Sequence, residues 1–290
     1  MTAPSRRPSG LNPLRGLEVC AVFLALVPLF WVLDLSGLFA WQQQVLPYPF
    51  FSEIGVLVAL PIGITWLARR DLASEGFALA RSSAPPQLAL GAIGFTWLST
   101  LPFLLLPALG ATYKTLAGAA ILAASNMVCG VTMLLATRRD AVVVAPVAIS
   151  NAMVSVRVLV LLGAGVFGTL LTAGTVPVAS RLLAGALITA FCEELFFRGY
   201  MQGGLDAAFG RRWKWVGISV GPGLFVAAVA FGCFHLVPFI AVAREIPWPW
   251  ALWTTAFGIF AGALRAKSDS ITLPWIMHGT LLAIRAIGSG

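Results

Sequence analysis

The sequence has few charged residues for its length. Lysine, arginine, aspartate and glutamate together make up 10% of its 290 residues, whereas 59% are hydrophobic. A soluble domain carries roughly 25% charged residues, because its surface must face water. The low charge therefore excludes an ordinary soluble protein. The mean hydropathy of +0.91 and the long apolar runs indicate an integral membrane protein instead.

Metal-binding cysteine patterns are also absent. The chain has no CxxC, and its cysteines all fall inside apolar runs: Cys20, Cys129, Cys192 and Cys233. This distribution is typical of buried membrane thiols rather than a zinc ribbon. The net charge of +8 does not indicate nucleic acid either, because the basic residues form short clusters between apolar runs, such as Arg69-Arg70 and Arg138-Arg139. We expect no nucleic-acid partner.

The apolar runs predict an all-α, polytopic transmembrane helical bundle of about eight to nine spans. The runs cover residues 17–40, 51–68, 87–108, 115–136, 142–174, 181–200, 216–237, 248–265 and 271–287. The first run is too long for a signal peptide, although Asp34 interrupts it, and is expected to be retained. The fifth contains Pro146 and Arg157, and is either one tilted span or two shorter pieces.

The distribution of lysine and arginine favours an inside N-terminus and one long fifth span. With nine spans, the outside segments hold Lys114, Arg181, Arg244 and Arg285, and Arg157 stays unassigned. The inside segments hold Arg6, Arg7, Arg15, Arg69, Arg70, Arg81, Arg138, Arg139, Arg198, Arg211, Arg212, Lys214, Arg265 and Lys267. Cytoplasmic loops carry the excess of basic residues, so this topology satisfies the positive-inside rule.

Two features outside the spans have simple interpretations. Tryptophans near run ends fit an aromatic belt at the membrane surface: Trp41, Trp213, Trp215, Trp248 and Trp250. The segment 71–81 has no clean helical stripe, and is either a short interfacial helix or a plain loop.

Ionisable residues inside the apolar runs are the functional candidates, because such groups are costly in lipid. The chain has eleven acidic residues and two histidines. Both histidines, His235 and His278, lie in apolar helices, and two adjacent glutamates, Glu193 and Glu194, end the sixth run. Polar chemistry is thus concentrated in the last three or four helices.

Helix geometry separates the two glutamates. Glu194 lies four residues before Arg198, the better orientation for a helical ion pair. Glu193 lies about 100° round the helix and is free to face the bundle interior as a general base for water. Alternatively, all three residues form a snorkelling cluster at a cytoplasmic helix end.

Three motifs in order resemble the CPBP family, which contains the CAAX prenyl endopeptidases and their bacterial relatives. They are Glu-Glu-x-x-x-Arg at 193–198, Phe-x-x-x-His at 231–235 and a third-helix His278. The resemblance covers about residues 180–287. We therefore divide the chain into N-terminal transmembrane helices, 1–175, and a CPBP-like catalytic core, 176–290.

The resemblance implies an intramembrane endopeptidase of the glutamic type. Glu193 is expected to activate water, with help from His235, while Glu194 and Arg198 support it and His278 stabilises the oxyanion. The implied partners are membrane lipid and a membrane-associated or lipidated polypeptide substrate. The implied location is the bacterial cytoplasmic membrane, with a cytoplasmic N-terminus. One position departs from the family pattern: many members carry Asn or Asp four residues after the third histidine, where this chain has Leu282.

Other functions use the same residues. Glu193, His235 and His278 match a catalytic His2Glu zinc set, but HExxH is absent, so we expect no cofactor and keep zinc as the alternative. A proton relay in a transporter or a noncatalytic immunity or scaffold protein are further alternatives. If the protease prediction is correct, the functional atoms of Glu193, His235 and His278 converge within roughly 4–8 Å, allowing for one bridging water.

Overall fold

A computed structural model describes residues 11–45, 50–77, 79, 82–83, 86–137, 143–144, 150–241 and 245–288. The helices and strands are α1 (Pro13–Leu35), α2 (Leu38–Val45), α3 (Phe50–Ile54), η1 (Gly55–Ala59), α4 (Leu60–Leu67), η2 (Ala73–Phe77), β1 (Ser82–Ser83), α5 (Pro86–Leu105), η3 (Pro107–Leu109), α6 (Leu116–Ala136), β2 (Val143–Val144), α7 (Asn151–Ala173), α8 (Pro177–Leu183), η4 (Ala184–Thr189), α9 (Ala190–Glu194), η5 (Leu195–Gln202), α10 (Gly203–Phe209), β3 (Trp213–Trp215), β4 (Ile218–Val220), α11 (Pro222–Phe234), α12 (Val237–Ala241), α13 (Trp248–Ser268) and α14 (Thr272–Gly288).

The chain is an all-helical membrane protein with two very short antiparallel strand pairs, β1–β2 and β3–β4. Six helices among the described residues are long and apolar enough to cross a bilayer: Pro13–Leu35, Phe50–Leu67, Gln87–Leu109, Leu116–Ala136, Asn151–Ala173 and Pro222–Phe239. The predicted count of eight to nine spans is therefore not confirmed. The helix that carries the glutamates is interrupted by charges, and the last helix is short for a span.

Two predicted runs begin later than expected. The fifth run, 142–174, becomes a single helix only from Asn151, because Ser150 caps it and Val143–Val144 pairs as a strand with Ser82–Ser83. Similarly, the seventh run starts at Pro222, because residues 218–220 pair with residues 213–215 in a hairpin. Both errors arose from apolar strand residues that look like helix in a hydropathy profile.

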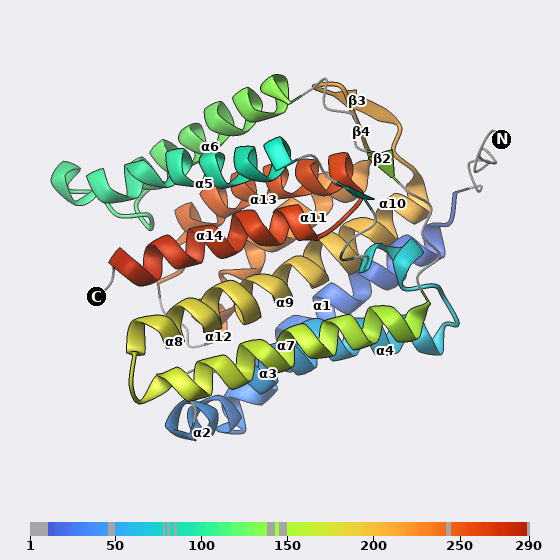
Figure 1. Cartoon of the computed structure of the whole chain (residues 1–290), viewed down its shortest axis with the longest axis horizontal. Helices are drawn as coiled ribbons and strands as arrows, with labels where there is room; N and C mark the ends of the chain where they lie inside the picture. Colours follow the sequence, from blue (N-terminus) through green and yellow to red (C-terminus); the bar gives the residue numbers. More distant parts are fainter. Residues whose placement is uncertain are drawn as a thin grey trace.

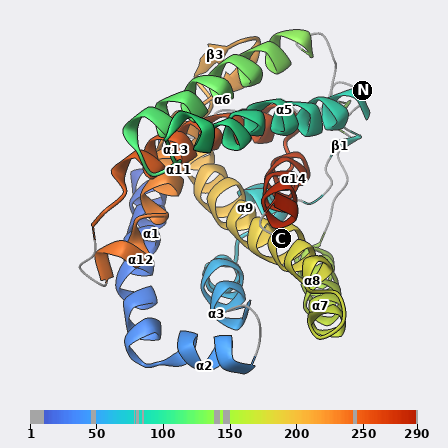
Figure 2. The same cartoon turned by 90° about the vertical axis from the view of Figure 1, so that its left-hand side faces the viewer.

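A long helix made of α8, η4, α9, η5 and α10 runs through the middle of the bundle (Figure 1). In Figure 2 it runs diagonally, with α1 and α3 on one side and α14 on the other, and α5 and α6 lie above it. It contacts α1, α7, α11 and α14 along its length. This central position buries every residue from Ala190 to Leu205. Ionisable residues on this stretch are thus shielded from lipid by neighbouring helices.

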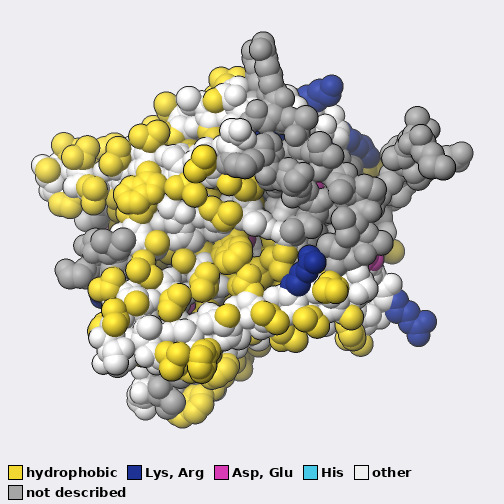
Figure 3. Space-filling view, viewed as in Figure 1, with side chains coloured by type: hydrophobic (Ala, Val, Ile, Leu, Met, Phe, Trp, Pro, Cys, Tyr) yellow, Lys and Arg dark blue, Asp and Glu magenta, His cyan; other side chains and the backbone are white. Residues whose placement is uncertain are grey.

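The outer helices expose apolar side chains, as a membrane protein must. Large hydrophobic residues are exposed on α1, α5, α6 and α7, for example Leu24, Leu104, Val128 and Phe167. Hydrophobic side chains spread over the face seen in Figure 3, and lysine and arginine lie toward one end. Such a surface is stable in a hydrocarbon solvent rather than in water.

Small residues let α11 and α13 pack closely. A Cβ on Gly232 would overlap the Ala251 carbonyl oxygen, and a Cβ on Gly258 would press against Ala228. Close approach of helix backbones through small residues is the usual way membrane helices associate. In this case it also brings the backbone carbonyl of Gly258 to the edge of the site described below.

The segment after the second span contains a short helical element, η2, that packs against the bundle. Leu72 and Phe77 are fully buried, and η2 packs on η5. Gly76 adopts a φ of +109°, a conformation that favours glycine, and approaches the Gly199 carbonyl oxygen so closely that a side chain would not fit. The described part of segment 71–81 therefore packs its apolar residues against the central helix and leaves Asp71 and Ser74 exposed.

Ion pairs gather at the end of the bundle that holds η2. Arg15 contacts Glu18 and Glu75, and Arg70 Nη2 lies 2.6 Å from Glu18 Oε2. A second group lies at the C-terminal end of α13, where Asp269 Oδ1 is 3.0 Å from Arg265 and 3.2 Å from Arg211, while Arg211 Nε is 2.8 Å from Asp206. Lys114, one of the residues predicted to lie outside, lies over Phe239 and Trp250 near the N-terminal end of α13. The predicted inside set and the predicted outside set of basic residues therefore include members at opposite ends of the bundle.

Candidate active site

The two glutamates sit on a short α-helical segment between two π-helical stretches. Glu193 and Glu194 end α9, with η4 before them and η5 after them. π-helical turns are rare and occur often at functional sites, because the extra residue per turn redirects side chains and carbonyls. A uniform 100° step per residue therefore describes α9 but not the helix on either side.

Glu194 and Arg198 form the ion pair that their spacing predicted. Arg198 Nε lies 3.2 Å from Glu194 Oε2, and both residues are 0% exposed. The guanidinium also lies over the Phe231 ring, 4.4 Å from its centroid, and donates to the Gly258 carbonyl at 3.4 Å. Arg198 had been counted among the inside basic residues, but burial places it in the site instead. The snorkelling interpretation is therefore wrong for this pair.

His278 contacts both glutamates. Its Nδ1 lies 2.9 Å from Glu194 Oε1, and its Nε2 lies 3.7 Å from Glu193 Oε2. Because an ionised carboxylate only accepts hydrogen bonds, Nδ1 carries a proton in the contact with Glu194. The rings of Phe231 and Phe257 flank the imidazole at 5.6 and 5.4 Å. His278 is buried, and its orientation is fixed from several sides.

His235 approaches from the end of α11. It is the C-cap residue of that helix, half-buried, and its Nδ1 lies 2.8 Å from the Phe231 carbonyl oxygen. A carbonyl can only accept, so Nδ1 bears the proton, and Nε2 is the acceptor of the neutral ring. Trp250 lies 5.3 Å away between ring centroids. This tryptophan, predicted as a membrane-surface anchor, packs on a site residue.

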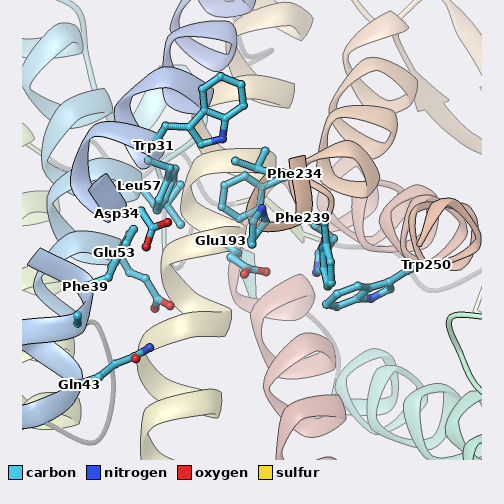
Figure 4. A pocket seen from close by; sticks show the side chains of 15 residues that line it. Trp31, Asp34, Phe39, Gln43, Glu53, Leu57, Glu193, Phe234, Phe239 and Trp250 are labelled. Carbon is cyan, nitrogen blue, oxygen red and sulfur yellow. The ribbon is translucent and has the colours of Figure 1, made fainter. Parts of the chain in front are cut away.

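Glu193 and His235 line the same cavity, which has a volume of about 780 Å³. Glu193 is 9% exposed and points toward this space (Figure 4). His278 does not line the cavity, but reaches Glu193 from the protein side. The structure thus brings four of the five predicted residues into one chain of contacts, Arg198–Glu194–His278–Glu193, and joins His235 to them across the cavity.

The N-terminal helices contribute polar residues that sequence reasoning did not select. Asp34 of α1, Gln43 of α2 and Glu53 of α3 line the cavity with Glu193. Thr189 Oγ1 donates to Glu53 Oε2 at 3.0 Å, which ties α3 to the central helix. The signal was present in part, since Asp34 and Glu53 are acidic residues in or beside apolar runs. No motif linked them to the C-terminal third of the chain.

Leu282 does not face the cavity. It lies one turn after His278 on α14 and is partly buried against Gly185 of η4. A Cβ added at Gly185 would lie 3.3 Å from the Cβ of Leu282. Its side chain fills the space between the two helices.

The residues do not fit the zinc alternative. Within the described part of the chain, no three His, Cys, Asp or Glu side chains come close enough together to hold a metal ion. We therefore derive no step through a metal.

The fold and the site define a class: a helical membrane protein with a glutamate–arginine–histidine cluster buried beside a cavity between its helices. Residues 175–284 match the family model of type II CAAX prenyl endopeptidase Rce1-like proteins, and all five predicted site residues lie within this range. This match supports the CPBP family membership that the motifs predicted. The family indicates a membrane endopeptidase of the CAAX-protease type. Comparison with curated proteins and with solved structures gives no match.

Proposed function

We propose that this protein is an intramembrane endopeptidase in which Glu193 and His235 activate a water molecule. The observation that carries the proposal is that both side chains line one cavity, while His278 contacts Glu193 from behind. A carboxylate and a neutral imidazole facing one space supply two acceptors for the hydrogens of a single water. The family match supports the same class of reaction.

Charge balance gives His278 its role. Glu193 and Glu194 carry two negative charges, and Arg198 balances one of them. A protonated His278 brings the cluster to neutrality, which is the favourable state for a group buried in a membrane. In that form Nδ1–H donates to Glu194, and Nε2–H is directed toward Glu193. The imidazolium then holds Glu193 in place and balances its charge from the protein side, because His278 does not line the cavity.

The reaction follows from these positions. Glu193 accepts a proton as the water oxygen attacks the carbonyl carbon, and the C–O bond forms while the carbonyl electrons move to the oxygen. Nε2–H of His278 holds the Glu193 carboxyl group in place from the protein side. When the C–N bond breaks, the proton held by Glu193 passes to the leaving amine, and a free carboxylic acid and amine result. Leu282 takes no part, because it packs against Gly185 rather than facing the reacting atoms.

The substrate in this proposal is a membrane-associated or lipidated polypeptide, because only such a chain reaches a cavity within the helical bundle. The end that holds the paired arginines Arg15, Arg70, Arg211 and Arg265 faces the cytoplasm, in keeping with the positive-inside rule. We propose the bacterial cytoplasmic membrane as the location, on the family resemblance.

The experiment is cleavage of a library of membrane-derived peptides by purified protein in nanodiscs. Glu193→Gln keeps the shape of the side chain but removes the base, and is expected to lower cleavage by at least ~10³-fold with little change in the unfolding temperature. Glu245→Gln is the matched control, because Glu245 is exposed and does not line the cavity. Equal cleavage by wild type and Glu193→Gln would show that Glu193 is not the base.

A further inference from the structure

The wall of the cavity opposite the three C-terminal motifs has a distinct chemistry. It comes from α1, α2 and α3, which lie outside the family match, and it combines aromatic rings with two carboxylates and an amide. In Figure 4, Asp34, Gln43 and Glu53 lie together on one side of Glu193, and Phe239 and Trp250 lie on the other. None of the proposed catalytic steps uses the residues of this wall.

The ionisable residues on the described cavity surface are three acids and His235. The described lining contains Asp34, Glu53 and Glu193, and it includes no lysine or arginine. Lys114 lies over the rings of Phe239 and Trp250, at 5.1 and 5.8 Å from their centroids, but is not itself part of the lining. Carboxylates in a low-dielectric surrounding favour an occupant that brings positive charge.

The aromatic rings favour the same occupant. Phe30, Trp31 and Phe39 line the cavity beside Asp34, and the faces of such rings attract ammonium and guanidinium groups. The position of Lys114 shows that the far aromatic wall already accommodates a cation from outside. Trp31 also places a buried indole N–H in this region, and the described residues offer it no hydrogen-bond acceptor. A polypeptide carbonyl would supply one.

The distance from the reacting atoms is short. Glu53 accepts a hydrogen bond from Thr189, which precedes Glu193 by four residues, or about one helical turn of roughly 6 Å. An extended polypeptide advances about 3.3–3.6 Å per residue. A group bound near Glu53 and Asp34 therefore belongs to a residue about two or three positions from the bond that Glu193 addresses. The volume of about 780 Å³ has room for such a side chain and its neighbours.

We propose that Asp34 and Glu53, with the rings of Phe30, Trp31 and Phe39, form a subsite for a lysine or arginine side chain of the substrate, close to the scissile bond. This inference rests on the proposed protease function and specifies its substrate class: a hydrophobic membrane polypeptide with a basic residue within about three positions of the cleaved bond. The N-terminal helices then select the substrate, and the C-terminal motifs cut it.

Binding tests the subsite without requiring cleavage. The protein is the Glu193→Gln variant in nanodiscs of neutral lipid, and the probes are a fluorescent hydrophobic peptide with one central lysine and the same peptide with norleucine. We expect the lysine peptide to bind at least about tenfold more tightly, because only it carries a charge for Asp34 and Glu53. Adding Asp34→Asn or Glu53→Gln should remove most of this preference, whereas adding Glu245→Gln should leave it unchanged.

Charge reversal gives a second readout. Asp34 is exposed to the cavity, so Asp34→Lys should leave folding intact and shift the preference toward a peptide with a central glutamate. Equal binding of the lysine and norleucine peptides, or no binding of either, overturns the subsite. So does a preference that survives both Asp34→Asn and Glu53→Gln. A clear lysine preference without any Glu193-dependent cleavage in the library assay would instead refute the proposed protease and leave the subsite standing.

Discussion

Removing Arg198 tests the buried cluster most directly. Arg198→Ala leaves Glu194, which is 0% exposed, without its cation in the middle of the bundle. Breaking one partner of a buried ion pair costs about 3–5 kcal/mol, since the remaining charge is uncompensated. At roughly 2–4 °C per kcal/mol for a chain of this size class, the unfolding temperature should fall by on the order of 10 °C. Cleavage should be lost as well, because Glu194 no longer holds His278 in the same position.

The control is an ion pair with the same chemistry and more exposure. Arg70 and Glu18 have side chains that are 28% and 29% exposed, and their atoms lie 2.6 Å apart. Because solvent screens such a pair, Arg70→Ala should cost about 1 kcal/mol or less. The double variant Glu194→Gln/Arg198→Met removes both buried charges, and should recover most of the stability without recovering activity.

The assay is thermal unfolding in nanodiscs, followed by tryptophan fluorescence, for both single variants and the double variant. A loss in Arg198→Ala no larger than that in Arg70→Ala would refute the reasoning about burial. Failure of Glu194→Gln/Arg198→Met to regain stability would show that packing around Phe231 and Gly258, rather than charge, dominates at Arg198.

Three further predictions follow from other contacts. Exhaustive chelation should leave peptide cleavage within about twofold, since Glu193 and His235 hold the water; bound stoichiometric zinc whose return restores lost activity would contradict this. Gly203→Ala should lower the unfolding temperature, because its new Cβ would overlap the Glu75 carbonyl oxygen. Gly94→Ala has nothing within 4 Å of its new Cβ and should stabilise the protein by up to about 1 kcal/mol. If Gly94→Ala were instead the less stable variant, η2 would lie away from the central helix. Leu282→Asn should leave the cleavage rate within about threefold, because the residue at 282 faces Gly185; a tenfold gain would identify a missing oxyanion donor.

The sequence alone was sufficient to predict that lipid surrounds the protein, that its fold is helical, and where most helices end. A chain with 10% charged residues has too little charge for a water-facing surface, and backbone hydrogen bonding in lipid leaves helices as the natural solution. The i,i+4 spacing of Glu194 and Arg198 was also sufficient to predict their pairing, because both atoms of that interaction lie on one helix. Local and compositional properties are readable in this way since they depend on neighbours in the chain.

Only the tertiary structure decided how the site is assembled. No spacing in the sequence indicates that His278 bridges the two glutamates, since α14 reaches the central helix across 84 residues of chain. The π-helical stretches around α9 redirect side chains in a way that a uniform helical period cannot describe. In the sequence, Asp34 and Glu53 are isolated acidic residues in apolar runs. The packing of α1 and α3 places them in the same cavity as Glu193. Contacts between distant segments depend on which helix faces fit together, and that information lies in the packed bundle rather than in any one run of residues.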